Sequence, residues 1–310
     1  MRQKYASGLG EDQSTSIRIS GKTIEEVGFD KIQQQMSNLA ELQIVVIDEL
    51  CVHGQDVDDR DKDTTRFAAV CPKTKELDLS RNLFEDVADL LHLCGGLEKL
   101  ESLKMDGNRF SENTSLPMNM LRAAPFSTLK SLSLEDTMLE WDQVMPFSPR
   151  QDPGANILQI ESICFYFPSL TSLSLAGNAL ETIPANALLP TSITTLNLER
   201  NRFATLRDVS LAKTLPALRH LSLKHNRVRA TASQHDDEQD VFPVTLEELD
   251  LSDNKISSWA IVDALPRWFP GLKSLRLPHN EIYHSEDAFT TTVARLGQLD
   301  TLNYSTVRLR

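Results

Sequence analysis

Hydrophobic residues recur along this chain in one short pattern, which is clearest at residues 170–180. Leucines stand at the first, fourth, sixth and eleventh positions of this stretch, and an asparagine stands at the ninth. Leu173 and Leu175 alternate with polar or small residues, as in a short strand with one buried face, so both are predicted to point into a core. Asn178 follows where the chain leaves the strand. Its side-chain amide can satisfy backbone groups that no neighbouring strand reaches.

The same eleven-residue frame recurs throughout the chain. Frames begin at Leu42, Thr74, Leu100, Leu129, Leu170, Ile193, Leu218, Leu246, Leu272 and, in a truncated form, Leu299. Seven of the nine complete frames have asparagine at the ninth position: Asn82, Asn108, Asn178, Asn201, Asn226, Asn254 and Asn280. Most intervals between frames lie in or near the roughly 20–29 residues of a leucine-rich repeat. The sequence therefore predicts an α/β leucine-rich repeat solenoid. We expect it to be curved, with about ten rungs, a parallel sheet on the concave side, and helices and loops on the convex side.

The frames also predict how the chain is divided. Residues 1–16 are polar and are expected to form a flexible lead-in. Residues 17–41 are predicted to cap the first rung, with a strand at 17–19 and a helix at 23–37. The repeat domain then spans 42–303, and 304–310 form a truncated tail. Because no C-terminal cap is evident, we expect the natural protein to continue beyond this point.

Between frames, helical spacing predicts short helices on the convex side. They are expected at residues 84–93, 118–124, 157–167, 206–215 and 259–265. The last of these is expected to end before Pro266, because proline lacks the amide that continues a helix. The segments 141–156 and 231–240 are expected to be loops, and the second is acidic.

Composition narrows the class of partner. The net charge is −12, which disfavours bulk attraction to nucleic acid or to an anionic membrane. No apolar run approaches the roughly 20 residues that cross a bilayer. The four cysteines show no C-x-x-C spacing and no clusters at the ends, so they are predicted to be reduced and mostly buried, as in a cytosolic protein.

Catalytic and metal-binding spacings are absent from the sequence. None of the common nucleotide, zinc-protease or nucleophile-elbow motifs occurs. His220, His225 and His279 recur along the ladder, but on different rungs and without acidic partners at ligand spacing. The sequence therefore predicts a protein that is not an enzyme and that has no cofactor and no metal site.

Partner choice should depend on the variable positions that point away from the core. Positions three, five and seven of each frame are predicted to face the concave surface, where the small Ser174 and Ala176 leave room for a partner. Residues 199–229 hold eight cationic residues against two acidic ones, in a protein that is acidic overall. The predicted partner-binding residues are Arg200, Arg202, Lys224, His225, Arg227, Arg109, Lys255, Asn197, Ser174 and Arg276. The alternatives are a plain solvated face and, more remotely, a nucleic-acid surface, although no aromatic residues interleave with the charges.

Segments beside the repeats resemble a known family. Residues 20–32 contain Val-Gly-Phe-Asp, residues 254–259 read Asn-Lys-Ile-Ser-Ser-Trp, and residues 296–303 read Leu-Gly-Gln-Leu-Asp-Thr-Leu-Asn. These stretches are similar to tubulin-specific chaperone E, also called tubulin-folding cofactor E. The likeness extends over nearly the whole chain.

The resemblance implies a non-enzymatic, cytoplasmic and cytoskeleton-associated protein. It would bind α-tubulin while the αβ-tubulin heterodimer is assembled or taken apart, together with other tubulin-folding cofactors. Members of the family commonly carry a CAP-Gly domain and a ubiquitin-like domain. Neither is recognisable here, so the chain is expected to be the isolated repeat region of such a protein or a short member of the family. A generic leucine-rich repeat scaffold, such as a phosphatase-regulating protein, is the alternative.

Overall fold

The computed structural model describes residues 17–19, 22–24, 38–53, 66–86, 89, 93–110, 126–139, 167–184, 189–209, 215–229 and 242–307. Within this part of the chain, eleven short strands form one sheet in the order β13-β12-β11-β10-β9-β8-β7-β6-β5-β4-β3. The strands are β3 (Ile44–Val46), β4 (Glu76–Asp78), β5 (Ser102–Lys104), β6 (Ser131–Ser133), β7 (Ser172–Ser174), β8 (Thr195–Asn197), β9 (His220–Ser222), β10 (Glu248–Asp250), β11 (Ser274–Arg276), β12 (Thr301–Leu302) and β13 (Ser305–Thr306).

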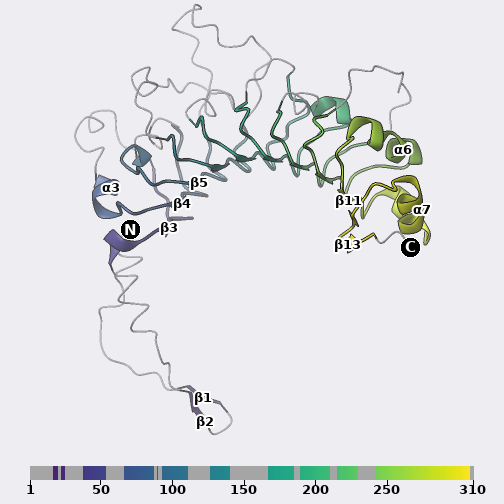
Figure 1. Cartoon of the computed structure of the whole chain (residues 1–310). Coiled ribbons are helices and arrows are strands. Elements are labelled where there is room, and N and C mark those ends of the chain that lie inside the picture. Colours follow the sequence, from purple (N-terminus) through teal and green to yellow (C-terminus); the bar gives the residue numbers. More distant parts are fainter. Residues whose placement is uncertain are drawn as a thin grey trace, which may run out of the picture.

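Neighbouring rungs pair in register. Strands β3 to β12 are parallel, and each belongs to one frame, so the rungs can be numbered one to ten in chain order. Leu132, Leu173 and Leu196 therefore stand opposite one another at position four. Figure 1 shows the rungs stacked into an arc whose inner side is lined by the sheet. The predicted leucine-rich repeat solenoid is confirmed.

The leucine ladders form one continuous core. Leu173 and Leu175, the predicted inward positions of rung five, are both 0% exposed. The largest fully buried side chains lie outside the strands and fill the space behind the sheet: Phe84, Phe167, Phe203 and Phe269. Each rung buries its apolar face only against its neighbours, so stability depends on contacts between successive rungs.

The asparagine ladder fastens each rung to the one before it. Asn201 Nδ2 donates to the carbonyl oxygens of Leu175 and Leu198, both at 3.0 Å. Asn201 Oδ1 accepts from the backbone amides of Asn178 at 3.1 Å and Leu180 at 3.0 Å. These are the backbone groups that the short strands leave without ladder partners, as the sequence analysis predicts.

The residue at position eight, which precedes the asparagine in seven of the frames, takes the left-handed backbone conformation in every complete frame. These residues are Glu49, Arg81, Gly107, Asp136, Gly177, Arg200, His225, Asp253 and His279. The turn brings the asparagine side chain under the strand. At Gly177 (φ 72°) a Cβ would lie 1.9 Å from Asp136 Oδ1, so a larger residue there would displace the carboxylate that holds Arg200.

Helix α6 (Trp259–Trp268) confirms one predicted helix but not its end. The helix continues through Pro266, whereas the sequence predicted that it ends before this residue. Proline removes one backbone hydrogen bond. The next turn still closes, because the Phe269 amide donates to the Leu265 carbonyl at 2.8 Å and Phe269 is 0% exposed in the core. Packing of Phe269 in the core therefore outweighs the tendency of Pro266 to end the helix.

Other convex elements match the sequence less well. Helices α3 (Arg66–Val70) and α7 (Ala288–Arg295), and the 3₁₀ turns η1 (Leu39–Glu41) and η4 (Glu281–His284), were not predicted. Of the helix predicted at 206–215, residues 206–209 form a 3₁₀ turn and 210–214 lie outside the described residues. Half of the helix predicted at 84–93 (residues 87, 88 and 90–92) and all of 118–124 lie outside the described residues, as do 157–166 and the predicted loops at 141–156 and 231–240.

The first described residues of the chain form a hairpin. Strand β1 (Ile17–Ile19) confirms the predicted strand and pairs antiparallel with β2 (Lys22–Ile24). The predicted start of a helix at residue 23 is therefore wrong, because Thr23 and Ile24 pair with Arg18 and Ile17 of β1. Residues 25–37 lie outside the described part of the chain. At the other end, residues 305–306 of the predicted tail pair with β12 as β13.

The cysteines differ in exposure. Cys71 and Cys94 are buried, as predicted, and burial raises the pKa of the Cys94 thiol to about 12. A thiol of this kind is unreactive near neutral pH. Cys51 is exposed, which corrects the prediction for that residue. Cys164 lies outside the described residues.

Candidate functional site

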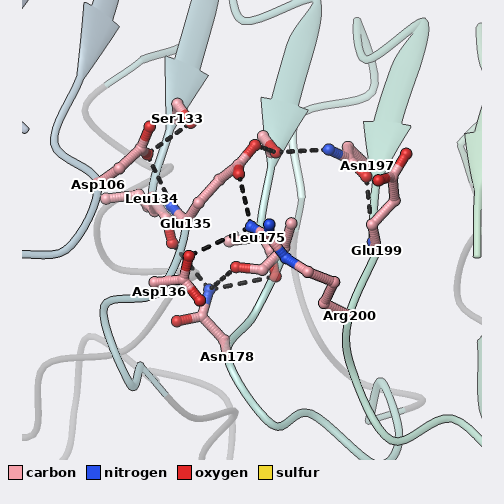
Figure 2. Close-up of polar contacts among 12 residues, drawn as sticks. Asp106, Ser133, Leu134, Glu135, Asp136, Leu175, Asn178, Asn197, Glu199 and Arg200 are labelled. Carbon is pink, nitrogen blue, oxygen red and sulfur yellow. Dashed lines mark hydrogen bonds and ion pairs between the residues drawn. The ribbon is translucent and has the colours of Figure 1, made fainter. Parts of the chain in front are cut away.

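Polar side chains on the concave face bond to one another across neighbouring strands. Asn197 Nδ2 on β8 donates to Ser174 Oγ on β7 at 2.9 Å, and Ser174 Oγ donates to Glu135 Oε1 at 2.6 Å. Figure 2 shows this chain of contacts running across three rungs. The structure thus brings together two predicted partner-binding residues, Asn197 and Ser174. Their hydrogen-bonding groups are largely used within the protein.

Arg200 reaches across a whole rung. Its Nη2 lies 3.1 Å from Glu135 Oε2 and 3.2 Å from Asp136 Oδ2, both of which belong to rung four (Figure 2). Rung five, which lies between, has Ala176 and Gly177 at the same two positions. Ala176 is only 1% exposed, so the prediction that it leaves room for a partner is wrong. These small residues instead make room for an internal ion pair.

Sequence reasoning did not single out Glu135 and Asp136, the acids that hold Arg200. The small residues Ala176 and Gly177 of rung five were the available sequence signal for this ion pair. A long side chain can cross a rung only where the side chains of that rung are short. The spacing alone does not reveal the pair, since Arg200 and Glu135 are 65 residues apart in the chain.

Three acidic residues of the early rungs, Asp78, Asp106 and Glu135, form a column on the concave face. Burial raises the pKa of the Asp106 carboxyl, and the nearby charges of Glu135 and Asp78 raise it further. Two bonds to Asp106 Oδ1 oppose this shift: Ser133 Oγ donates at 2.6 Å and the Glu135 amide donates at 2.8 Å. The column is thus held in place although its members repel one another.

Cations line the rim where the strands of rungs six to eight lead into the ascending loops. Arg202, Arg227 and Lys255 occupy position ten of these successive rungs, and all three are exposed. Together they are called the basic rim. Arg202 Nη1 lies 3.7 Å from Glu181 Oε1 in an exposed pair. Among the described residues, Arg227 and Lys255 have no side-chain hydrogen bond or ion pair. Charge on this rim is therefore largely available to a partner.

The other predicted cations are engaged differently. Lys224 lies at position seven of rung seven, partly buried, and makes no ion pair with the described residues. Arg109 Nη1 donates to backbone carbonyl oxygens, among them that of Gly107 at 3.2 Å. Arg276 Nη1 lies 3.3 Å from Asp250 Oδ2, and its guanidinium lies 4.5 Å from the centre of the Tyr304 ring. Among the described residues, the predicted cations therefore divide into those with an internal partner (Arg109, Arg200, Arg202 and Arg276) and those without one (Lys224, Arg227 and Lys255).

The histidines have acidic partners, which corrects the sequence analysis. His225 Nε2 lies 3.6 Å from Asp253 Oδ2, and His279 Nδ1 lies 2.8 Å from Asp253 Oδ1. His220 Nδ1 lies 3.3 Å from Glu248 Oε2. Stacking places residues one repeat apart next to each other, which spacing within a single frame does not show. No group of three or more potential metal ligands comes together among the described residues.

No helix in the described part of the chain is both long enough and apolar enough to cross a bilayer.

Comparison with known proteins supports the repeat fold and the resemblance. The family model described as "Leucine Rich repeat" matches residues 243–258. Tubulin-specific chaperone E of Danio rerio is 28% identical over 98% of this chain and 54% of its own length. Tubulin-folding cofactor E of Arabidopsis thaliana is 29% identical over 100% of this chain and 56% of its own length. The chain thus spans about half the length of these curated relatives.

Among solved structures, the LRIM1/APL1C complex is similar with 19% identity and a TM-score of 0.48, over 87% of this chain and 40% of that chain. The resemblance inferred from the sequence is confirmed by the curated relatives. The chain is therefore a leucine-rich repeat solenoid that is similar, over nearly its whole length, to proteins named tubulin-specific chaperone E and tubulin-folding cofactor E.

Proposed function

We propose that this chain is a non-catalytic module of a tubulin-folding cofactor that binds α-tubulin during assembly or disassembly of the αβ-tubulin heterodimer in the cytoplasm. The relatives named tubulin-specific chaperone E support tubulin as the client, because their similarity extends over 98% of this chain. In this proposal other tubulin-folding cofactors act on the same tubulin.

The basic rim is the observation that carries the choice of surface. Rungs of a parallel sheet lie roughly 4.8 Å apart, so the three cations stand close together. Two unit charges about 5 Å apart in water repel by about 0.8 kcal/mol. The protein has a net charge of −12, yet Arg227 and Lys255 are not neutralised by any described residue. Carboxylates of an acidic partner would relieve this repulsion and would steer the partner toward the rim.

The module acts by binding alone. A protein that binds one state of its client more tightly shifts the client toward that state by the difference in binding free energy. The chain would therefore favour α-tubulin that is separated from, or strained against, its partner subunit. Any nucleotide hydrolysis in the cycle would be performed by another component.

Charge reversal on the rim tests the proposal. The variant Arg202→Glu, Arg227→Glu, Lys255→Glu is titrated with purified αβ-tubulin at several salt concentrations, by biolayer interferometry and size-exclusion chromatography. Binding by the wild-type chain should weaken as salt rises, because the contacts are exposed charges. The variant should bind at least about tenfold more weakly at low salt, since three exposed pairs at about 0.5 kcal/mol each are lost.

A matched control carries the same number of charge reversals at position two, which precedes the strands. The control is Lys75→Glu, Lys130→Glu, Lys273→Glu, and it should bind tubulin as the wild type does. Equal weakening in both variants would show a general charge effect and would reject the rim as the site. Absence of any tubulin binding by the wild-type chain would reject the proposed function. Recovery of a phosphatase in place of tubulin would favour the scaffold alternative.

A further inference from the structure

The basic rim is part of a longer exposed row at position ten. In rungs four and five the same position holds Met138 and Ala179, and both are exposed. Met138 is 69% exposed, although the adjacent Leu139 is only 5% exposed. The row from Met138 to Lys255 therefore presents, in order, a large apolar side chain, a small one and three cations. It is called the position-ten row.

The apolar end of the row is held in an uncommon backbone conformation. Met138 has a φ of 60° and Ala179 a φ of 59°, both in the left-handed region. Residues with a Cβ adopt this region at a cost, and a bulky side chain does so rarely. The chain thus keeps a large apolar side chain in solvent at a position where glycine would fit with less strain. Non-glycine residues in strained backbone conformations of this kind are enriched at functional sites.

Charges mark where the row ends. In rung nine, position ten is occupied by the exposed acid Glu281. An acidic partner lying along the row would be repelled there and would therefore end near Lys255. In rung three the same position is occupied by Arg109, which is bonded to backbone carbonyls. The position-ten row, from Met138 to Lys255, thus lies between Arg109 and Glu281.

Spacing along the row selects the conformation of the partner. Rungs lie roughly 4.8 Å apart, so rungs four to eight span about 19 Å. Successive turns of an α-helix lie 5.4 Å apart, and about 13 helical residues cover this length. In an extended strand, side chains on one face are about 6.7 Å apart and move out of step with the rungs by about 2 Å at each one. A helix therefore places one side chain against each rung, and a strand does not.

From these observations we propose that the position-ten row is a docking surface for an amphipathic α-helix of a partner protein. The helix has about four turns, with acidic side chains on three successive turns facing the basic rim and an apolar side chain two turns further on, against Met138. Ala179 leaves room for the helix backbone between the two contacts. This proposal uses the same rim as the proposed function, but it does not depend on tubulin being the partner.

A pair of designed peptides tests the helical mode. The first is a fluorescein-labelled 18-residue alanine and glutamine peptide with glutamates at i, i+4 and i+7 and a leucine at i+14, all on one helical face. The second has the same composition, with the glutamates and the leucine distributed around the helix. Fluorescence anisotropy with the whole chain should show the first peptide binding at least about tenfold more tightly, because only its side chains face the row together. Circular dichroism should show helix formation on binding.

Variants of the chain locate the contact. Reversal of Arg202, Arg227 and Lys255 to glutamate should abolish the difference between the peptides. Met138→Ser should weaken the first peptide about fivefold through loss of buried apolar area and should leave the second unchanged. The control reversals at Lys75, Lys130 and Lys273 should have no effect.

Equal binding of the two peptides, or no saturable binding of the first, would overturn the proposal. Tubulin titrations on the same variants keep the two proposals separate. Tubulin binding that depends on the rim, without discrimination between the peptides, rejects the helical mode alone. Discrimination between the peptides without tubulin binding rejects only the tubulin proposal.

Discussion

Replacing Asn201 with alanine is expected to destabilise the solenoid strongly, and the structure sets the magnitude. The three carbonyl oxygens that receive Asn201 Nδ2 each keep a second donor. The backbone amides of Asn178 and Leu180 have no acceptor other than Asn201 Oδ1 among the described residues. Both residues are at most 4% exposed. An unsatisfied buried donor costs about 1–3 kcal/mol, so the loss of two predicts about 4 kcal/mol.

The assay is thermal and urea unfolding followed by circular dichroism. For a chain of this size, about 2 °C in Tm corresponds to 1 kcal/mol, so Asn201→Ala should lower Tm by about 8 °C. Asn197→Ala is the matched control, because its hydrogen bonds to Ser174 and Glu199 lie on the half-exposed concave face, where water replaces them. The control should lose under about 1 kcal/mol. Agreement between circular dichroism and tryptophan fluorescence transitions should be checked, since repeat arrays can unfold in steps.

A shift in Tm equal to that of Asn197→Ala would refute the reasoning. It would mean that water or a backbone movement satisfies the two amides once the side chain is removed. The ladder asparagines would then contribute geometry rather than stability.

Three further outcomes are expected. Gly177→Ala should lower stability by at least about 1 kcal/mol in urea unfolding, because φ is 72° and the new Cβ would collide with Asp136; unchanged stability would disprove the required close approach. Arg200→Gln should lower stability by less than about 1 kcal/mol, should reduce its salt dependence, and should leave tubulin affinity unchanged, since its exposed ion pairs are internal. Asp106→Asn should stabilise the protein at neutral pH, because the raised pKa means that folding disfavours the charged form while the amide oxygen keeps both hydrogen bonds. The contribution of Asp106 to the free energy of unfolding should fall as pH rises from about 3.8 through the raised pKa, and this fall should be missing from the pH-dependent unfolding of Asp106→Asn.

Predictions from the sequence were confirmed where the residues of a single frame determine the local structure. Leu173 and Leu175 are buried because alternation within a strand and stacking between rungs fix the same face. Predictions failed where a contact outside the local pattern decides the outcome. Helix α6 passes Pro266 because Phe269 packs in the core, and Thr23 lies in β2 because it pairs with β1.

The candidate surface divides in the same way. The sequence alone identified the cationic stretch and placed Arg200, Arg202 and Arg227 near one edge. It did not separate residues that are internally paired from residues that are available. That separation depends on neighbours a full rung or more away.

The amino-acid sequence by itself determined the rungs of this protein, the side chains that face its core and the asparagines that join one rung to the next. Each of these follows from local periodicity, because a short strand with alternating leucines buries them only by stacking on a similar strand. The tertiary structure alone decided which charges are neutralised. Arg200 meets Glu135 because the rung between them is small, whereas Arg227 and Lys255 have no acid within reach among the described residues. Electrostatic pairing depends on distance in space, and stacking makes residues from separate repeats neighbours.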